Sequence, residues 1–316
     1  MIPEAAPRLP RWTGVVRPAI VRAVDDCARI NQKVQRVAIV GTGLLGASLG
    51  LGLRSVGFTG TIIGIGRRLT TVRRAEEIGS VDEGTTDLEA AGSCGLVVLA
   101  TPLGSFARLL GTLARHDGVI TDVGSTKQQV CEDAQRLLAD PSRFVGSHPM
   151  AGSERHGPDA ARADLFSGRP CVLTPRSETS AEALETVRAL WGALGMVIST
   201  MAPEEHDRKI AAISHLPHVL AMELVHLGVD RAAIDVASTG FSGTTRVASG
   251  DPVVWSDIFR TNRGEVVRAV ELMIERLQRF NTAMRNESDD EVLAQLQTAK
   301  SIRDEWLNRA RNSNGT

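Results

Sequence analysis

Three glycines near the start of the chain have the spacing of a dinucleotide-binding turn. Gly41, Gly43 and Gly46 follow the apolar run Val37–Val40 in the order G-x-G-x-x-G, and the segment Leu44–Leu53 after them is rich in Leu and Ala. A strand, a glycine turn and a helix in this order bring the backbone close to a pyrophosphate, with the helix N-terminus facing the phosphates. The cofactor-binding residues that we predict in this turn are Gly41, Thr42, Gly43, Leu44, Leu45 and Gly46.

The end of the second predicted strand, Thr61–Ile65, indicates which dinucleotide is bound. An Asp or Glu usually stands there and accepts hydrogen bonds from the adenosine ribose. Here Gly66 takes that place and Arg67 and Arg68 follow. Guanidinium groups without the acid favour a 2′-phosphate over a 2′-hydroxyl. We therefore favour NADP over NAD, although both arginines could also be solvated loop residues.

Two side chains are candidates for the chemical step. Ser125 lies just after the predicted strand Val119–Val123, where ligands bind in parallel sheets, although it could also cap a helix at Lys127–Ala139. His148 is expected in a loop just beyond another strand, and Pro149 stiffens that loop. A neutral imidazole accepts a proton at physiological pH, which makes His148 the candidate base. Thr101 and Pro102, which end another predicted strand, are further candidate cofactor-binding residues.

A second group of polar side chains follows Pro203. His206, His215 and His218 lie close together, and the last two have a spacing that can bind zinc on a helix. No Cys, Asp or Glu set completes such a site, so no metal is predicted. Arg246 follows the turn predicted at Ser238–Gly240, and it is either a surface charge or a fork for a carboxylate.

The elements that must hold these residues alternate between strand and helix. The predicted strands are Val37–Val40, Thr61–Ile65, Cys94–Ala100, Val119–Val123, Cys171–Thr174 and Met196–Thr200, and the predicted helices between them are Leu44–Leu53, Thr70–Ile78, Leu103–Arg115, Lys127–Ala139 and Ser180–Leu194. Alternation of this kind predicts an α/β fold with a Rossmann-type, doubly wound parallel sheet.

From Pro203 onward the sequence predicts helices alone. They are Glu204–Leu227, Pro252–Asn262, Gly264–Asn281 and Asp289–Ala310, and Pro217 should bend or interrupt the first of them. We therefore divide the chain into residues 1–33, an N-terminal extension with one short helix at Ala19–Ile30, residues 34–200, the NAD(P)-binding domain, and residues 201–316, an all-α domain.

Composition excludes several classes of protein. The 316 residues carry a net charge of −1, and only 3% are aromatic, with no Tyr, which argues against nucleic-acid binding. No apolar run looks long enough to span a membrane. Four scattered cysteines suit reduced thiols, and the N-terminus lacks the apolar core of a signal peptide. We expect a cytoplasmic protein.

Six motifs in a fixed order resemble the prephenate/arogenate (cyclohexadienyl) dehydrogenase family of the TyrA type. They are GTGLLG at Gly41–Gly46, DVGSTK at Asp122–Lys127, GSHPMAGSE at Gly146–Glu154, EEHD at Glu204–Asp207, SHLPH at Ser214–His218 and TRVASGDPVVW at Thr245–Trp255. The resemblance implies a homodimer joined through the helical domain, which also binds substrate. It implies oxidative decarboxylation of prephenate and/or arogenate, with hydride transfer to NAD(P)+, in tyrosine biosynthesis. No chorismate mutase domain is expected before Val34, and no regulatory ACT domain is expected after Trp306.

The resemblance also assigns roles to individual residues. His148 matches the catalytic histidine that hydrogen-bonds the C4 hydroxyl of the substrate, and Ser125 matches the serine beside that hydroxyl. Arg246 matches the arginine that binds a substrate carboxylate. Four further residues match the substrate pocket, namely Ser153, His206, Ser214 and His218. Two departures from the family pattern are Gly66, where many NAD-using members keep an acid, and Ser242, where some prephenate-specific members carry Lys.

Alternatives remain open at this point. An amino analogue of prephenate, used in secondary metabolism, would suit the same residues. A β-hydroxyacid dehydrogenase relative would need a catalytic lysine in the helical domain, but no lysine lies between Lys209 and Lys300. A non-catalytic dinucleotide sensor would have no need of His148, Ser125 and Arg246.

Overall fold

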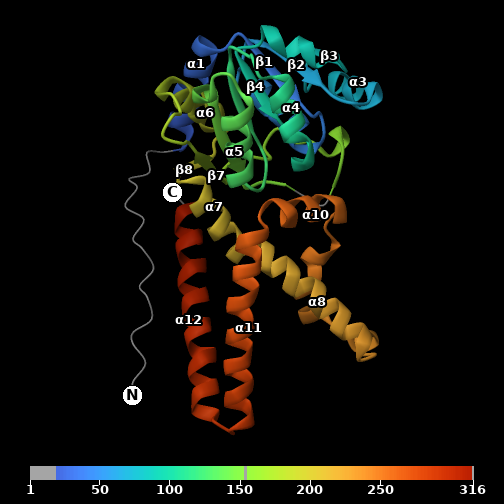
Figure 1. Cartoon of the computed structure of the whole chain (residues 1–316), viewed down its shortest axis with the longest axis vertical. Coiled ribbons are helices and arrows are strands. Elements are labelled where there is room, and N and C mark those ends of the chain that lie inside the picture. Colours follow the sequence, from blue (N-terminus) through green and yellow to red (C-terminus); the bar gives the residue numbers. More distant parts are fainter. Residues whose placement is uncertain (1–18, 153–154, 315–316) are drawn as a thin grey trace.

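The computed structural model describes residues 19–152 and 155–314. Figure 1 shows an α/β part, in which helices cover both faces of one sheet, and a helical part that extends away from it. The α/β part ends with strand β8 at Thr200, and the helical part begins with helix α7 at Pro203. The predicted fold class, a Rossmann-type sheet followed by helices, is confirmed.

The sheet contains eight strands in the order β3-β2-β1-β4-β5-β6-β7-β8. Their bounds are β1 Arg36–Val40, β2 Thr61–Ile65, β3 Glu83–Thr85, β4 Leu96–Leu99, β5 Val119–Asp122, β6 Phe144–Pro149, β7 Pro170–Thr174 and β8 Val197–Thr200. Neighbouring strands are parallel except β6 and β7, which are antiparallel. The sheet is therefore mostly parallel, as predicted, with one antiparallel pair. The chain order reverses beside β1, so β1 and β4 form the crevice in which such sheets bind ligands.

Apolar strands hold the sheet between two layers of helices. In β1 four of the five residues are buried, as expected of a strand that is covered on both faces. One buried cluster joins the sheet to α2 (Leu44–Ser55) and α6 (Ala181–Ala193), and the other joins it to α4 (Phe106–Thr112) and α5 (Gln128–Leu137). Helix α3 (Leu69–Glu77) packs beside β3.

The N-terminal helix α1 (Ala19–Lys33) belongs to the same core. It packs against α6, and its Cys27 and Ile30 are buried in the cluster on that face of the sheet. Of the two interpretations of this segment, a free tail or a packing arm, the described part from residue 19 fits the second.

The long helix predicted at Glu204–Leu227 is interrupted before Pro217. It consists of α7 (Pro203–Ile210), a π-helical segment at Ala211–His215 and α8 (Leu216–Asp230). Pro217 has no N–H to offer and its ring crowds the preceding turn, so the regular hydrogen-bond ladder cannot continue through it. The wider π turn directs His215 into the interior, where it is buried.

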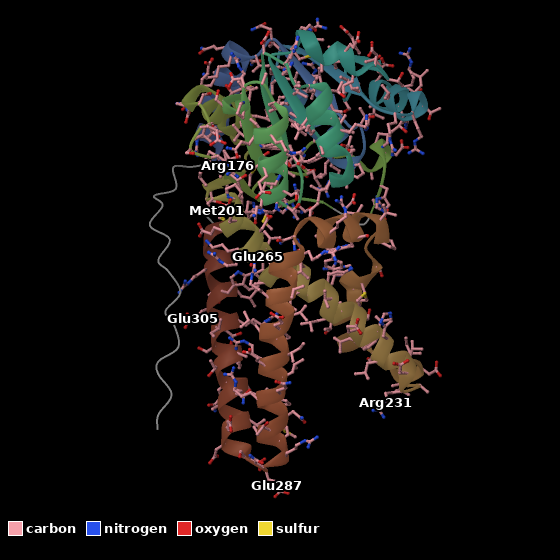
Figure 2. The ribbon with its side chains drawn as sticks, viewed as in Figure 1. Arg176, Met201, Arg231, Glu265, Glu287 and Glu305 are labelled. Atoms are coloured by element: carbon pink, nitrogen blue, oxygen red, sulfur yellow. The ribbon has the colours of Figure 1, made fainter. Side chains whose placement is uncertain are left out.

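The remaining helices are α9 (Thr239–Thr245), α10 (Pro252–Thr261), α11 (Arg263–Arg285) and α12 (Asp289–Asn314). Helix α9 replaces the turn that we predicted at Ser238–Gly240, so that prediction is wrong. Helices α11 and α12 lie side by side and project away from the sheet, and α8 diverges from them (Figure 1). Glu287 marks the far end of this pair and Arg231 the far end of α8 (Figure 2).

One stretch contradicts the expectation about membranes. Among the described residues, the helical stretch Pro203–Asp230 is long and apolar enough to cross a membrane by length and composition alone, and only a third of its apolar window is buried. A few polar residues interrupt this stretch, so no continuous apolar run marks it in the sequence.

Candidate active site

The glycine turn has the shape of a phosphate cradle. Gly41 has φ +107°, a conformation that side chains rarely adopt, and a Cβ atom at Gly46 would collide with the Gly41 carbonyl. Open space surrounds Gly43, and no side chain caps the N-terminus of α2. The hydroxyl of Thr42 is buried and has no hydrogen-bond partner among the residues that the structure describes. Free N–H groups, an unpaired hydroxyl and open space beside Gly43 fit the pyrophosphate of a dinucleotide.

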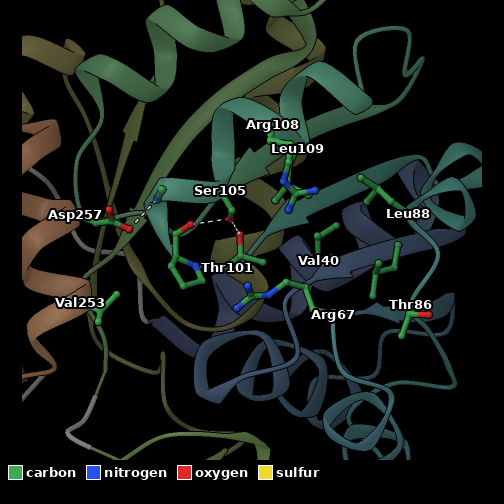
Figure 3. A pocket seen from close by; sticks show the side chains of 14 residues that line it. Val40, Arg67, Thr86, Leu88, Thr101, Ser105, Arg108, Leu109, Val253 and Asp257 are labelled. Carbon is green, nitrogen blue, oxygen red and sulfur yellow. Dashed lines mark hydrogen bonds between the residues drawn. The ribbon is translucent and has the colours of Figure 1, made fainter.

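A cavity of about 430 Å³ opens beside this turn at the ends of β1, β2 and β4. Figure 3 shows the guanidinium groups of Arg67 and Arg108 directed into it from opposite walls. Neither arginine forms an ion pair with another described residue. Thr101 and Pro102 line the cavity as predicted residues of the cofactor site, whereas Arg68, the residue before α3, does not.

The helical part closes one side of this cavity. Asp257 of α10 accepts a hydrogen bond from the backbone N–H of Gly104 at 3.0 Å, and Val253 of the same helix also lines the cavity (Figure 3). Asp257 is the only carboxylate among the lining residues, and this bond occupies one of its oxygens. The cavity wall is therefore dominated by cationic and apolar groups.

His148 lies inside strand β6, not in a loop beyond it. The register pairs His148 with Val172 of β7, so the antiparallel partner extends β6 as far as Pro149. The prediction of a loop was wrong because we took Pro149 to indicate one. A proline is also tolerated in a strand where its missing N–H is not needed for pairing. The side chain of His148 is 9% exposed. It therefore sits on a rigid element at the carboxyl end of the sheet's parallel portion.

Two residues of α7 continue from His148 as a hydrogen-bonded chain. Nδ1 of His148 lies 2.9 Å from Nε2 of His206, and Nδ1 of His206 lies 2.7 Å from Oδ1 of Asp207. All three side chains are buried. The structure thus brings together the predicted His148 and His206, which are 58 positions apart in the chain.

A buried ion pair lies beneath the same strand. The ammonium of Lys127 bonds to the carboxylate of Asp122, and it also donates to the backbone carbonyl of Ser147 at 2.8 Å. Asp122 in turn accepts the backbone N–H of Ser147 at 3.0 Å. Both charged side chains are fully buried. Together they hold the backbone beside His148 at two points.

Burial keeps the imidazoles of this region neutral. Burial lowers the pKa of His148 well below its usual 6.5, and the nearby His206 and Lys127 lower it further. Burial also lowers the pKa of His206, against the opposing effect of Asp207, and it lowers the pKa of His215 to about 4. Neutral His148 can accept a proton, which a protonated imidazole could not.

The other predicted site residues are less closely connected. Ser125 is half-buried in the turn after β5, and it does not cap the following helix, because Asp207 binds the first backbone N–H groups there. Ser214 is half-buried in the π-helical segment. Arg246 begins the short 3-10 helix Arg246–Ser249 beside α8, and its side chain is exposed. Ser153 lies outside the described residues.

His218 lines a second cavity, of about 590 Å³, together with Trp255, Arg260 and Arg263. Its ring stacks on that of Trp255 with centroids 3.6 Å apart. Nδ1 of His218 is buried without a hydrogen-bond partner among the described residues, and so is Nε2 of His215. A buried ring nitrogen without a partner is costly unless a polar group meets it, so Nδ1 of His218 suits a polar ligand in this cavity. The described residues contain no group of three or more His, Cys, Asp or Glu side chains that could hold a metal ion.

Sequence reasoning missed three residues that the structure places at the site. Asp207 was quoted within the motif EEHD but given no role, although a carboxylate next to a buried histidine is a signal for a hydrogen-bonded pair. Arg108 and Asp257 lie on helices, far in sequence from the glycine turn, and no local pattern places them at the cavity. Their part could be found only from the fold.

Comparison with known protein families fits this architecture. Residues 49–200 match the family model described as prephenate dehydrogenase, nucleotide-binding domain, and residues 202–298 match the model described as prephenate dehydrogenase, dimerization domain. The chain belongs to the prephenate dehydrogenase family. Its members are nicotinamide-dependent oxidoreductases, and the expected family and enzyme class are therefore confirmed.

Individual relatives are similar over most of their length. A prephenate dehydrogenase of Bacillus subtilis is 32% identical over 285 residues, which are 87% of this chain and 77% of the relative. A cyclohexadienyl dehydrogenase of Zymomonas mobilis is 30% identical over 85% of this chain and 95% of its own. The crystal structure of the Aquifex aeolicus prephenate dehydrogenase with hydroxyphenyl propionate and NAD+ has a TM-score of 0.82 and 33% identity, covering 86% of this chain and 98% of the other.

Proposed function

We propose that this protein catalyses the oxidative decarboxylation of prephenate and/or arogenate, with hydride transfer to NADP+ or NAD+, in tyrosine biosynthesis. The observation that carries the proposal is the buried, neutral His148 at the carboxyl end of β6, two strands from the β1–β4 crevice that a dinucleotide held by Gly41–Gly46 would enter. Family membership supplies the substrate class, a cyclohexadiene that carries a C4 hydroxyl and a ring carboxylate.

His148 acts as the base for the first bond changes. When bound, the nicotinamide accepts the hydride that leaves C4. The C4 hydroxyl loses its proton to the imidazole of His148 in the same step, and C4 becomes a carbonyl carbon. Ser125, in the turn after β5, orients the hydroxyl or the imidazole. Because the pKa of His148 is low, the ring is ready to accept the proton at neutral pH.

Loss of carbon dioxide completes the reaction without a second base. The bond between the ring and its carboxylate breaks, and its electron pair completes the aromatic ring and places negative charge on the former C4 oxygen. The imidazolium of His148 can return its proton to that oxygen, which regenerates the base. Arg246 pairs with a carboxylate of the substrate, and Ser214 and His218 contribute to the pocket. His206 lies behind His148, with both of its ring nitrogens engaged by His148 and Asp207.

NADP is the favoured cofactor. Gly66 stands where a ribose-binding acid would stand, and Arg67 lines the cavity next to it. Arg108 faces the same cavity from α4, so two guanidinium groups are available to a 2′-phosphate (Figure 3). Arg68 contributes to the local positive charge from outside the cavity lining.

The helical part joins two copies of the chain in a homodimer. The family model that covers residues 202–298 describes a dimerization domain. Exposed apolar side chains along the long helices support this assembly, namely Leu224 and Leu227 on α8, Leu272, Leu277 and Phe280 on α11, and Leu293, Leu296 and Trp306 on α12. The same assembly accounts for the apolar surface of Pro203–Asp230. A cytoplasmic location agrees with four cysteines that are buried and unpaired.

Steady-state kinetics tests the proposal directly. Prephenate, arogenate and an amino analogue of prephenate are each supplied with NAD+ and with NADP+, and formation of the reduced cofactor is followed by its absorbance. Turnover of either substrate, together with release of carbon dioxide, supports the proposed reaction. Turnover of the amino analogue alone would instead indicate an enzyme of secondary metabolism. Reduction of neither cofactor with any of the three substrates would refute the proposal.

A further inference from the structure

The carboxylate of Asp207 determines where hydrogen atoms lie along the buried chain that ends at His148. Oδ1 of Asp207 accepts the backbone N–H of Lys127 at 2.7 Å, and Oδ2 accepts that of Gln128 at 2.9 Å. These donors belong to the N-terminus of α5, where negative charge is stabilised. Asp207 therefore acts as an acceptor, and Nδ1 of His206 must carry the hydrogen in their 2.7 Å contact.

The second nitrogen of His206 then has a fixed role as well. A neutral imidazole carries one hydrogen, and in His206 this hydrogen is on Nδ1. Nε2 of His206 is consequently an acceptor, and its partner at 2.9 Å is Nδ1 of His148. The hydrogen of His148 must lie on Nδ1 to make this bond, which leaves Nε2 of His148 without one.

We infer that His206 and Asp207 are positioning residues that hold His148 in the tautomer with hydrogen on Nδ1, so that Nε2 is the atom that accepts the substrate proton. The assignment of tautomer stands on the hydrogen-bonded chain alone, whereas its use in catalysis rests on the proposed function. The hydrogen-bonded chain engages both ring nitrogens of His206, so the role of His206 differs from contact with substrate. It also makes Asp207, in the helical part, necessary for a base in the α/β part.

Several charged or titratable groups surround His148 and share in its protonation. Asp207, reached through His206, favours the imidazolium that forms when Nε2 takes the proton. Lys127 disfavours it, and its ion-pair partner Asp122 lies beyond it in β5. His215 contributes from the π-helical segment, and the thiol of Cys171 faces the backbone of His148 from β7. Among these groups, Asp207 is the carboxylate that the hydrogen-bonded chain connects to His148.

Nitrogen-15 NMR of the full-length protein with labelled histidine measures the tautomer without any substrate. Protonated and bare ring nitrogens give separate signals, and the signals of His148 are identified by their loss in His148→Asn. We expect the His148 signals of the Nδ1–H tautomer at mildly alkaline pH. Signals of the opposite tautomer would overturn the inference. This measurement stands even if neither prephenate nor arogenate is turned over, so the two proposals can fail separately.

Two substitutions at His206 separate its hydrogen bond to His148 from the space that its side chain fills. The amide oxygen of Gln in His206→Gln can still accept the hydrogen of His148, whereas Leu in His206→Leu cannot. We expect His206→Leu to have turnover about tenfold or more below that of His206→Gln, with the KM for substrate little changed, because the aligned base is lost. Equal turnover in the two variants, with unaltered circular dichroism, would overturn the positioning role.

Asp207→Ala provides the second variant should His206→Leu fail to fold. Without the carboxylate, His206 is free to take either tautomer, and the NMR signals of His148 should move toward a mixture of the two. Asp140→Ala is the matched control, because Asp140 also accepts a helix-terminal N–H but lies before the start of β6, at the short helix Pro141–Arg143, whereas His148 lies at the other end of that strand. It should leave the His148 signals unchanged. Unchanged His148 signals in folded Asp207→Ala would show that Asp207 does not set the tautomer of His148.

Discussion

Asp207 accepts a hydrogen bond at 2.9 Å from the backbone N–H of Gln128, the first residue of α5. A carboxylate of the helical part therefore caps a helix of the α/β part. The two parts also meet where Thr126 and Thr261 share a hydrogen bond of 2.9 Å between their hydroxyls. Contacts of this kind between the two parts hold His206 within hydrogen-bonding distance of His148.

Replacement of Asp207 should measure how much this contact stabilises the fold. Loss of a helix cap costs about 0.5–2 kcal/mol, and loss of a hydrogen bond to a charged group costs about 1.5–3 kcal/mol. We expect Asp207→Ala to lower the free energy of unfolding in urea by about 2–4 kcal/mol. Asp140→Ala, at an exposed cap, should lower it by about 0.5–1 kcal/mol. Equal losses in the two variants would contradict the role of Asp207 as a link between the parts.

Cofactor preference should depend on Arg67 and Arg108. Each guanidinium can form charge-assisted bonds to a 2′-phosphate and finds no such partner on NAD. We expect Arg67→Ala and Arg108→Ala each to raise the KM for NADP by about tenfold, with the KM for NAD nearly unchanged. Arg68→Ala, outside the cavity lining, should have a smaller effect.

A binding measurement separates this cofactor prediction from catalysis. Titration with 2′,5′-ADP and with 5′-AMP, followed by calorimetry, reports affinity for the 2′-phosphate alone. The unmodified protein should bind 2′,5′-ADP more tightly, and Arg67→Ala should reduce the difference. Equal kinetic efficiency with NAD and NADP in the unmodified protein would show that the arginines are ordinary surface charges.

The assembly should be dimeric at micromolar concentration. The apolar side chains exposed on α8, α11 and α12 exceed what a single copy covers, and burial of such surface favours association. Light scattering should give about twice the chain mass of 33.8 kDa. A monomeric mass under these conditions would refute the homodimer.

The sequence predicted those elements best whose signals are local. Strand β2 was placed at its observed bounds, Thr61–Ile65, because glycines limit an apolar β-branched run on both sides. Strand β3, at Glu83–Thr85, was missed because it is three residues long and partly exposed, so it shows no apolar alternation. Hydrophobic periodicity thus finds long or buried elements and overlooks short edge strands.

The site was predicted only in part, because its decisive contacts are between distant segments. The glycine turn could be read directly, since one short motif contains the strand end, the turn and the start of the helix. The bond between Asp207 and Lys127 joins residues 80 positions apart, and no local pattern reveals it. The antiparallel pairing that places His148 in a strand depends on β7, whose direction follows from tertiary packing.

Substrate affinity should depend on Arg246. Its guanidinium is exposed, and no ion pair joins it to another described residue, so it is available to a carboxylate. A hydrogen bond between charged groups contributes about 1.5–3 kcal/mol. We expect Arg246→Ala to raise the KM for substrate by about tenfold or more, with the KM for the cofactor unchanged. An unaltered substrate KM would exclude Arg246 from the site.

The pH dependence of turnover should identify His148 as the base. Protonation of Nε2 would remove the lone pair that accepts the substrate proton, so activity must fall on the acid side. Because burial holds the pKa of His148 well below 6.5, this fall should begin below that pH, and activity should be level through neutral pH. His148→Asn retains a hydrogen-bonding group but cannot take a proton. We expect its turnover to drop by about 10²–10⁴-fold, with substrate and cofactor binding retained and the acid limb absent from the residual activity. A variant that keeps near-normal turnover, or the same acid limb, would assign the base to another group, and His218, whose Nδ1 is buried without a partner among the described residues, would be tested next.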